Sequence, residues 1–191
     1  RATVDVNHDR ESCAAHEILS EELIVSSQGA LANAVAWLEG VPQGKDWPAG
    51  EVALDQKGCV YVPHVAVVGV GKPVVFRNSD PVLHNVNAFP LNNPPLNVSL
   101  LAQGQGRPVQ RALKLPDEIK ITCDAHKWMG AWLIVRDNPY YAVTGPDGSF
   151  SLEGIPAGTW KLVVWHESLH KVEKTVVIAP GENAVDLELA P

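Results

Sequence analysis

The stretch "ITCDAHKWMGAWLIV", residues 121–135, places three metal-binding side chains at three-residue intervals just before an apolar run. Cys123, His126 and Met129 form the pattern C-x-x-H-x-x-M, and Met129 is the only methionine among 191 residues. A thiolate, an imidazole and a thioether suit copper, which prefers a trigonal plane of two His and one Cys with a weak axial Met. The stretch therefore predicts a copper loop that needs a second histidine from elsewhere.

Other metals fit this pattern less well. Zinc binds Cys and His but seldom Met, and the chain has neither the C-x-x-C pair of many zinc sites nor the C-x-x-C-H of haem attachment. The best source of the second histidine is "GKPVVFRNSDPVLHNVNAF", residues 71–89. There a predicted strand ends in a polar turn, and His84 opens the next strand.

The rest of the chain has the composition of an all-β protein. Its 15 Pro and 15 Gly separate short segments rich in Val, Ile, Leu and aromatic residues, several of which alternate apolar and polar side chains. We expect β-sandwiches, a single short helix within 9–23, and an irregular excursion over about 88–110. The net charge of −7 argues against nucleic acid as a partner. The apolar runs are far shorter than the roughly 20 residues that a transmembrane helix needs.

Three further motifs accompany the copper loop. They are "Y-x-P-x-V" at 61–65, "G-K-P-V-V-F-R-N" at 71–78 and "H-N-V" at 84–86. In this order and spacing, the four motifs resemble the cupredoxins, and the loop resembles the short amicyanin-type loop. The resemblance implies a Greek-key β-sandwich over residues 50–137 that holds one type 1 (blue) copper ion.

The resemblance also implies a role for each matching residue. His84, Cys123 and His126 would be the equatorial copper ligands, and Met129 would be the axial ligand. Asn85 would donate its backbone N–H to the copper thiolate, a contact that orients the ligand and tunes the reduction potential.

In the cupredoxins, a ligand histidine on an exposed loop passes electrons to partners through an apolar patch. By resemblance, His126 would be that exit, and Trp128 with Trp132 would form the patch. The chain would be an electron carrier rather than an enzyme. Related copper enzymes place a histidine beside the copper cysteine, whereas Thr122 and Asp124 flank it here.

The acidic balance favours a basic partner such as a c-type cytochrome, and a membrane oxidoreductase is another expected partner. Two alternatives stay open at this point: a protein that stores or delivers copper, and a fixed relay subunit of a larger redox complex. A storage or delivery protein would release copper readily to a chelator, and a fixed relay subunit would co-purify with its complex, whereas a free carrier would do neither.

The C-terminal part carries a different pattern. Residues 144–164 read T-x-x-D-G-x-F-x-L-x-x-I-P-A-G-T-W-x-L-x-V, which resembles the carboxypeptidase-regulatory-like, transthyretin-like β-sandwich. Strands are expected at 148–154 and 183–189 among others. The first two strands of such a module are missing there, but 25–38 have their character.

We therefore predict a discontinuous second sandwich built from 20–45 and 139–191, with the cupredoxin inserted and 1–19 as an N-terminal extension. The alternative is two domains in series, 1–137 and 139–191. In the resembled family this sandwich is a binding or spacer module.

The remaining cysteines and histidines give weaker indications. With Cys123 assigned to copper, Cys13 and Cys59 are left to form a disulfide; the alternative is two buried thiols. A disulfide implies an oxidising compartment, so we expect a periplasmic or otherwise exported protein whose signal peptide is absent from this sequence. His64 is expected to end a strand, and His166 and His170 in "WHESLH" are expected to make an interdomain contact rather than a metal site.

Overall fold

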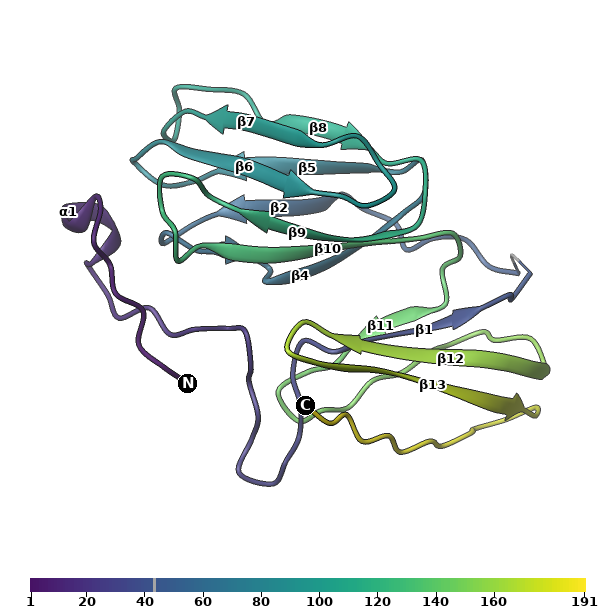
Figure 1. Ribbon diagram of the computed structural model, residues 1–191. Helices are drawn as coiled ribbons and strands as arrows, with labels where there is room; N and C mark the ends of the chain where they lie inside the picture. Colours follow the sequence, from purple (N-terminus) through teal and green to yellow (C-terminus); the bar gives the residue numbers. More distant parts are fainter. Residues whose placement is uncertain (43) are drawn as a thin grey trace. The chain divides into compact units, whose positions relative to one another are not determined.

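The computed structural model describes residues 1–42 and 44–191. It divides into two compact units, of which the first comprises 1–20 with 49–137 and the second 21–48 with 138–191. Nearly all regular structure in the described residues is β-strand (Figure 1). The all-β prediction is therefore confirmed.

The first unit consists of two sheets. One has the strand order β4-β10-β9-β6-β7 and the other β3-β2-β5-β8. Most neighbours are antiparallel, but β10 with β4 and β2 with β5 are parallel. The strands are β2 (Val52–Gln56), β3 (Tyr61–Val62), β4 (Val65–Gly69), β5 (Pro73–Asn78), β6 (His84–Phe89), β7 (Leu96–Leu100), β8 (Val109–Ala112), β9 (Asp117–Thr122) and β10 (Gly130–Arg136). Figure 1 shows the two sheets packed face to face.

Alternating apolar residues of these strands fill the space between the sheets. Leu54 and Phe76 come from one sheet and Ile121 and Leu133 from the other, and all four are buried in one cluster. Burying each such side chain stabilises the fold by about 1.5–3 kcal/mol. The same cluster extends to Cys123 and Met129 at one end of the sandwich, so the proposed copper loop sits on the core.

Residues 1–19, expected to be an N-terminal extension, belong to the first unit. Thr3 and Leu19 form a β-bridge, and the Val4 N–H donates to the Ile18 carbonyl at 2.9 Å. The helix expected within 9–23 is limited to one turn, α1 (Arg10–Cys13). A disulfide joins Cys13 to Cys59, with an S–S distance of 2.02 Å, as the sequence predicted.

The prediction of an irregular excursion over 88–110 is wrong. Strand β7 and the first residues of β8 lie in this range and pair with β6 and β5. The many Asn, Pro and Gly residues obscured a short alternating stretch, Leu96–Leu100, whose apolar side chains face the core.

The second unit contains one antiparallel sheet in the order β11-β1-β12-β13. Its strands are β1 (Val35–Glu39), β11 (Tyr141–Val143), β12 (Gly158–His166) and β13 (Leu169–Ile178). Strand β1 lies between β11 and β12, and pairs with both. Residues from before and after the first unit thus share one sheet.

The strands expected at 148–154 and 183–189 are not formed. Their alternating apolar residues still pack against the buried cluster of the second unit: Phe150, Leu152, Val185, Leu187 and Leu189. Alternation drives one face of a segment to be buried, but it does not supply a neighbouring strand for the backbone. The transthyretin-like sandwich is accordingly not established by this single sheet.

No helix in the described part of the chain has the length and hydropathy needed to cross a membrane.

Candidate metal centre

The copper loop predicted from the sequence is a closed connection between β9 and β10. Cys123 follows the last residue of β9, and Met129 precedes the first residue of β10. The Met129 N–H donates to the His126 carbonyl at 2.9 Å, and the Cys123 N–H donates to the Met129 carbonyl at 3.3 Å. These two bonds close the loop, so that its cysteine, histidine and methionine all lie at one end of the sandwich.

Strand β6 brings His84 to the same place. The Nδ1 atoms of His84 and His126 lie 2.8 Å apart. The Cys123 Sγ lies 4.0 Å from the first of these nitrogens and 3.6 Å from the second. All three side chains are fully buried. Cys123 and His126 follow His84 by 39 and 42 positions along the chain, yet the three side chains form one compact cluster that can hold a metal ion.

A carboxylate holds the outer nitrogen of each histidine. His84 Nε2 lies 3.0 Å from Asp80 Oδ2, and His126 Nε2 lies 3.0 Å from Asp9 Oδ2. A neutral imidazole that donates from Nε2 keeps its lone pair on Nδ1. In that tautomer both lone pairs point into the cluster, where a proton shared between the two rings or a bound metal ion satisfies them. This arrangement fits a metal bound by two Nδ1 atoms and a thiolate.

The thiol has its own hydrogen-bond environment. The Asn85 N–H points at Cys123 Sγ from 3.5 Å, and the Asn85 Oδ1 lies 3.3 Å from the same sulfur. That Oδ1 also accepts the Asp124 N–H at 2.6 Å. Asn85 therefore connects the strand that carries one histidine to the residue that follows the cysteine.

Two buried polar side chains fix the backbone next to the ligands. The Tyr61 hydroxyl lies 2.7 Å from the Asn85 carbonyl and 3.0 Å from the Thr122 carbonyl. Gln56 donates to the Asn85 carbonyl at 2.9 Å and to the Tyr61 oxygen at 3.1 Å. Asn85 and Thr122 directly adjoin His84 and Cys123, so the Gln56 and Tyr61 side chains hold together the backbone next to the histidine and the cysteine.

The protonation of the cluster follows from these contacts. Burial works against the thiolate, but the hydrogen bond with His84 and the backbone N–H of Asn85 outweigh it and lower the pKa of Cys123. Burial likewise disfavours a charged His84, yet Asp80 and Cys123 raise its pKa above the ordinary value. Burial and the neighbouring His84 lower the pKa of His126. A thiolate is the metal-binding form of cysteine, so the lowered pKa of Cys123 favours metal binding, whereas a proton held by His84 competes with the metal.

The structure corrects one expectation about the exit for electrons. His126 was expected to be exposed, but its side chain has no solvent-accessible surface. The N-terminal segment covers its outer edge: Asp9 bonds to Nε2, and the His8 ring centre lies 5.5 Å away. The expectation assumed a bare loop, whereas residues that precede the sandwich in sequence pack over this one.

The two tryptophans predicted to form a partner surface are each half-buried. The Trp128 ring packs edge-on against His126, with 5.1 Å between ring centres, and its Nε1 donates to the Cys59 carbonyl at 3.0 Å. Trp132 lies within β10, where its N–H donates to the His64 carbonyl. Met129 is buried on the ligand loop, and its axial role stays a prediction.

The remaining groups contribute less. Cys59, Asp80 and His84 also cluster, but the disulfide removes the Cys59 thiolate from consideration as a ligand. His64 lies buried between β3 and β4, in line with the strand-end expectation. His166 is buried in β12, where its Nδ1 accepts the Ser168 N–H, and His170 is exposed.

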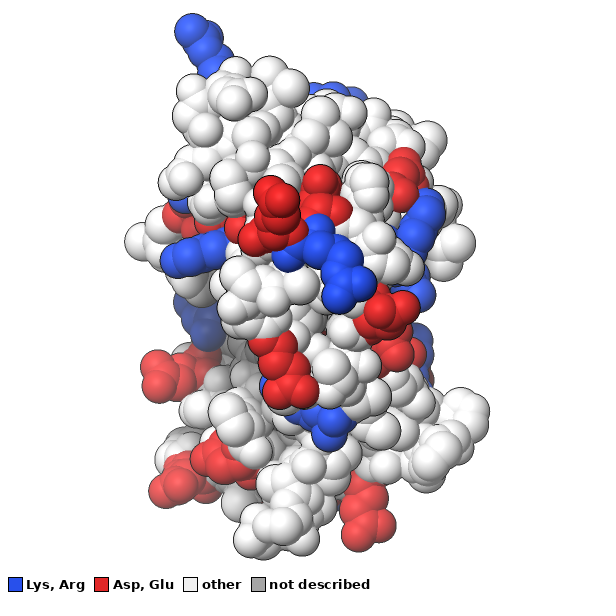
Figure 2. Space-filling model, turned by 90° about the vertical axis from the view of Figure 1, so that its left-hand side faces the viewer, with Lys and Arg blue, Asp and Glu red and all other residues white. Residues whose placement is uncertain are grey.

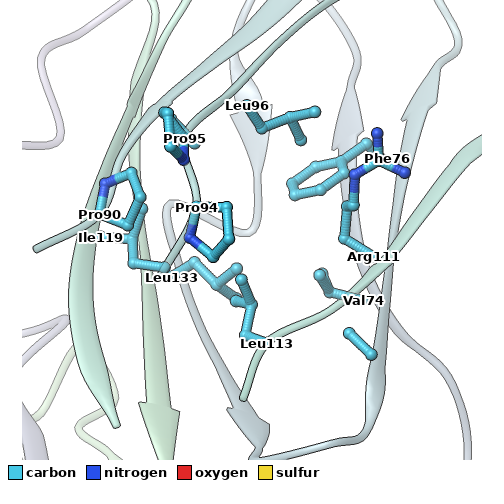
Figure 3. A pocket seen from close by; sticks show the side chains of 12 residues that line it. Val74, Phe76, Pro90, Pro94, Pro95, Leu96, Arg111, Leu113, Ile119 and Leu133 are labelled. Carbon is cyan, nitrogen blue, oxygen red and sulfur yellow. The ribbon is translucent and has the colours of Figure 1, made fainter. Parts of the chain in front are cut away.

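An apolar cavity of about 110 Å³ lies between the two sheets of the first unit, lined from both of them (Figure 3). Val74, Phe76, Ile119 and Leu133 line it, and Arg111 is its one charged lining residue. It has no metal-binding or nucleophilic side chain, so it is separate from the metal cluster.

Sequence comparisons give no family for this chain: no family model matches, and no curated protein matches. Solved structures do match. A copper-containing nitrite reductase from Thermus scotoductus is 22% identical, with a TM-score of 0.41 over 51% of this chain and 25% of its own. The chain thus spans about a quarter of that protein.

Two smaller proteins match over nearly their whole length. A purple cupredoxin from Nitrosopumilus maritimus is 19% identical over 45% of this chain and 100% of its own, with a TM-score of 0.38. Amicyanin from Paracoccus versutus is 15% identical over 53% and 97%, with a TM-score of 0.38. All these scores are below 0.5, so the function proposed below rests on the residues of the site.

Several residues of this centre were not found from the sequence. Asp80 lies only four positions before His84 in "SDPVLH", so a contact between the two could have been inferred from the sequence. Tyr61 opens the motif Y-x-P-x-V at 61–65, but the motif gave it no role at the site, and Gln56 carried no signal of its own. Asp9 has no signal at all, because 117 positions separate it from His126.

Proposed function

We propose that the chain is a type 1 copper protein that carries single electrons between redox partners. The observation that carries this proposal is the convergence of the His84 and His126 Nδ1 atoms on Cys123 Sγ, with the Asn85 N–H directed at the sulfur. Copper supplies one-electron oxidation and reduction when it is bound. A thiolate with two imidazoles and a nearby thioether is the ligand set for this role.

Each residue has a distinct task in the proposal. Cys123 provides the covalent thiolate bond, and the two histidines complete the plane. Met129 would be the weak axial ligand, and Asn85 would set the charge on the sulfur through its N–H. The ligands are buried and hydrogen-bonded before metal binds, so they need little rearrangement when one electron is added or removed.

The second unit has a supporting role in this proposal. We assign residues 50–137, together with the N-terminal segment 1–19, to a cupredoxin module, and 20–45 with 139–191 to a carboxypeptidase-regulatory-like module. The pairing of β1 with β11 and β12 supports an insertion of the copper module into the second one. The second module has no metal cluster among its described residues and would serve as a spacer or binding module.

The proposed partner is a redox protein such as a c-type cytochrome or a membrane oxidoreductase, in the periplasm or another oxidising compartment. The Cys13–Cys59 disulfide supports the compartment. Charge gives only weak guidance about the partner: Figure 2 shows Lys and Arg interspersed with Asp and Glu on the face that it views. Long-range steering from such a face is modest.

Copper storage or delivery is the second candidate. A delivery protein exposes at least one ligand to its acceptor, whereas all three ligands here are buried. Burial therefore favours a carrier that keeps its metal. A fixed relay subunit shares the same site and differs only in whether the chain co-purifies with a larger complex.

The experiment that tests the proposal is a visible and EPR spectrum of the protein loaded with Cu(II). We expect an intense thiolate-to-copper absorption band and a narrow copper hyperfine splitting. Reversible one-electron reduction should bleach the band. A colourless protein that does not retain copper contradicts the proposal, and a coloured protein that releases copper readily to a chelator supports delivery instead.

A further inference from the structure

The outer edge of His126 is held by an N-terminal residue, Asp9, whose geometry is not that of an ordinary helix cap. Asp9 directly precedes α1, and Asp at this position normally accepts a hydrogen bond from an N–H of the first turn. Here its side chain makes no capping bond. The carboxylate instead contacts the imidazole, and its Oδ2 lies 3.0 Å from His126 Nε2.

The backbone of Asp9 is also unusual. Its φ of 46° and ψ of 42° lie in the left-handed region, which only a few per cent of non-glycine residues adopt, Asn and Asp more often than the others. A residue keeps such a conformation when its surroundings require it. The Asp9 carbonyl accepts the Ser12 and Cys13 N–H groups, so the turn that orients Asp9 ends in the half-cystine.

The disulfide connects this turn to the support of the other histidine. Cys13 is bonded to Cys59, whose N–H donates to Asp80 Oδ2 at 2.8 Å. The Gly58 N–H donates to the other oxygen of Asp80 at 2.6 Å, and Asp80 bonds to His84 Nε2. One covalent bridge therefore joins the two segments that orient the two imidazoles.

We propose that Asp9 is a positioning residue of the metal centre, delivered by an N-terminal segment that the Cys13–Cys59 disulfide anchors. Asp9 fixes the Nε2–H tautomer of His126, directs Nδ1 inward, and places a negative charge beside the metal. The assignment deepens the proposed function and rests on it for the identity of the metal. The hydrogen bond itself does not depend on that identity.

The test uses two variants of the full chain and one control. Asp9→Asn keeps an oxygen acceptor and tolerates the left-handed backbone, but it removes the charge. Asp9→Gly removes the side chain without straining the backbone. Asp5→Asn makes the same charge change at an exposed acid of the same segment.

The first measurement is NMR of the histidine ring nitrogens in the metal-free protein. We expect wild-type His126 to carry its proton on Nε2, and Asp9→Asn and Asp5→Asn to preserve this. Asp9→Gly should transfer population to the Nδ1–H tautomer. A merely structural role for Asp9 would leave the tautomer of a folded variant unchanged.

The second measurement is made on the copper-loaded protein. Asp9→Gly should weaken copper binding by roughly 10–100-fold in competition with a chelator, the usual cost of losing a carboxylate that supports a ligand histidine. Both Asp9 variants should raise the reduction potential, because a negative charge beside the metal favours Cu(II). Asp5→Asn should change neither quantity.

The outcomes separate this proposal from the proposed function. A wild-type protein that binds no copper overturns the function, and the tautomer measurement still decides the role of Asp9. A blue wild-type protein in which both Asp9 variants match Asp5→Asn in tautomer, affinity and potential overturns the role of Asp9. If Asp9→Gly does not fold, the potential of Asp9→Asn against Asp5→Asn decides.

Discussion

The strands of both units show the same alternation of apolar and polar residues, but the side chains buried inside the two units differ in chemical type. The core of the second unit is formed mainly from aliphatic and aromatic side chains of β1, β12 and the segments packed on them, and its buried polar residues, such as Asn138 and His166, form no metal-binding cluster among the described residues. The core of the first unit also contains a thiol and two imidazoles, whose polar atoms are all engaged. A buried polar group without partners costs several kcal/mol, so such a cluster exists only where many segments converge.

The difference teaches that an apolar core can be built from local alternation, whereas a buried polar cluster requires contacts from remote parts of the chain. The second unit buries 183–189 without forming a strand there. The first unit needs β6, the β9–β10 loop, the 57–60 turn and the N-terminal segment to complete one site. Mutations should therefore act differently in the two units.

The largest expected effect is that of Cys123→Ser. A hydroxyl cannot provide the soft covalent bond of the thiolate, so the visible copper band should disappear completely while the fold is retained. His170→Ala, at an exposed histidine of the second unit, is the control and should leave the spectrum intact. A blue Cys123→Ser protein would show that the ligand set is wrong.

Removing the disulfide should have the next largest effect. The double variant Cys13→Ala with Cys59→Ala opens a loop whose ends are 46 positions apart, and should lower the free energy of unfolding of the first unit by roughly 4 kcal/mol. Urea unfolding of the metal-free protein measures this. An equal loss in the second unit, or none in the first, would contradict the assignment of 1–20 to the first unit.

Leu38→Ala should destabilise the second unit by about 2–5 kcal/mol, because Leu38 is buried in the inner strand β1. The copper spectrum should persist at temperatures where the second unit is still folded. Val177→Ala, at a side chain that is 73% exposed on β13, is the matched control and should change stability by at most about 0.5 kcal/mol. If Leu38→Ala abolishes copper binding under conditions where the protein is folded, the units are not separable.

The smallest expected change is that of Met129→Leu. Leucine preserves the volume of this buried side chain but removes a weak donor to Cu(II), so the site should remain blue and its reduction potential should rise. Voltammetry of the loaded protein checks this. An unchanged potential would mean that Met129 is not the axial ligand.

The sequence by itself determined many of the strands and the residue types that gather at the site. Alternation in short segments such as "EIKITC", residues 118–123, predicted strands, because a sheet that buries one face leaves a period of two in the sequence. The C-x-x-H-x-x-M spacing predicted a metal loop, because all its members lie on one short connection. The remaining two cysteines predicted the disulfide that is present.

Tertiary structure alone decided how the site is enclosed. His126 is buried because residues 8 and 9 lie over it, and Asp9 bonds to it across 117 positions of the chain. It also decided which alternating segments became strands, since β7 found a partner in β6 while 183–189 formed no strand. The reason is the same in both cases. A periodic pattern records which side of a segment is buried, but not which distant segment buries it.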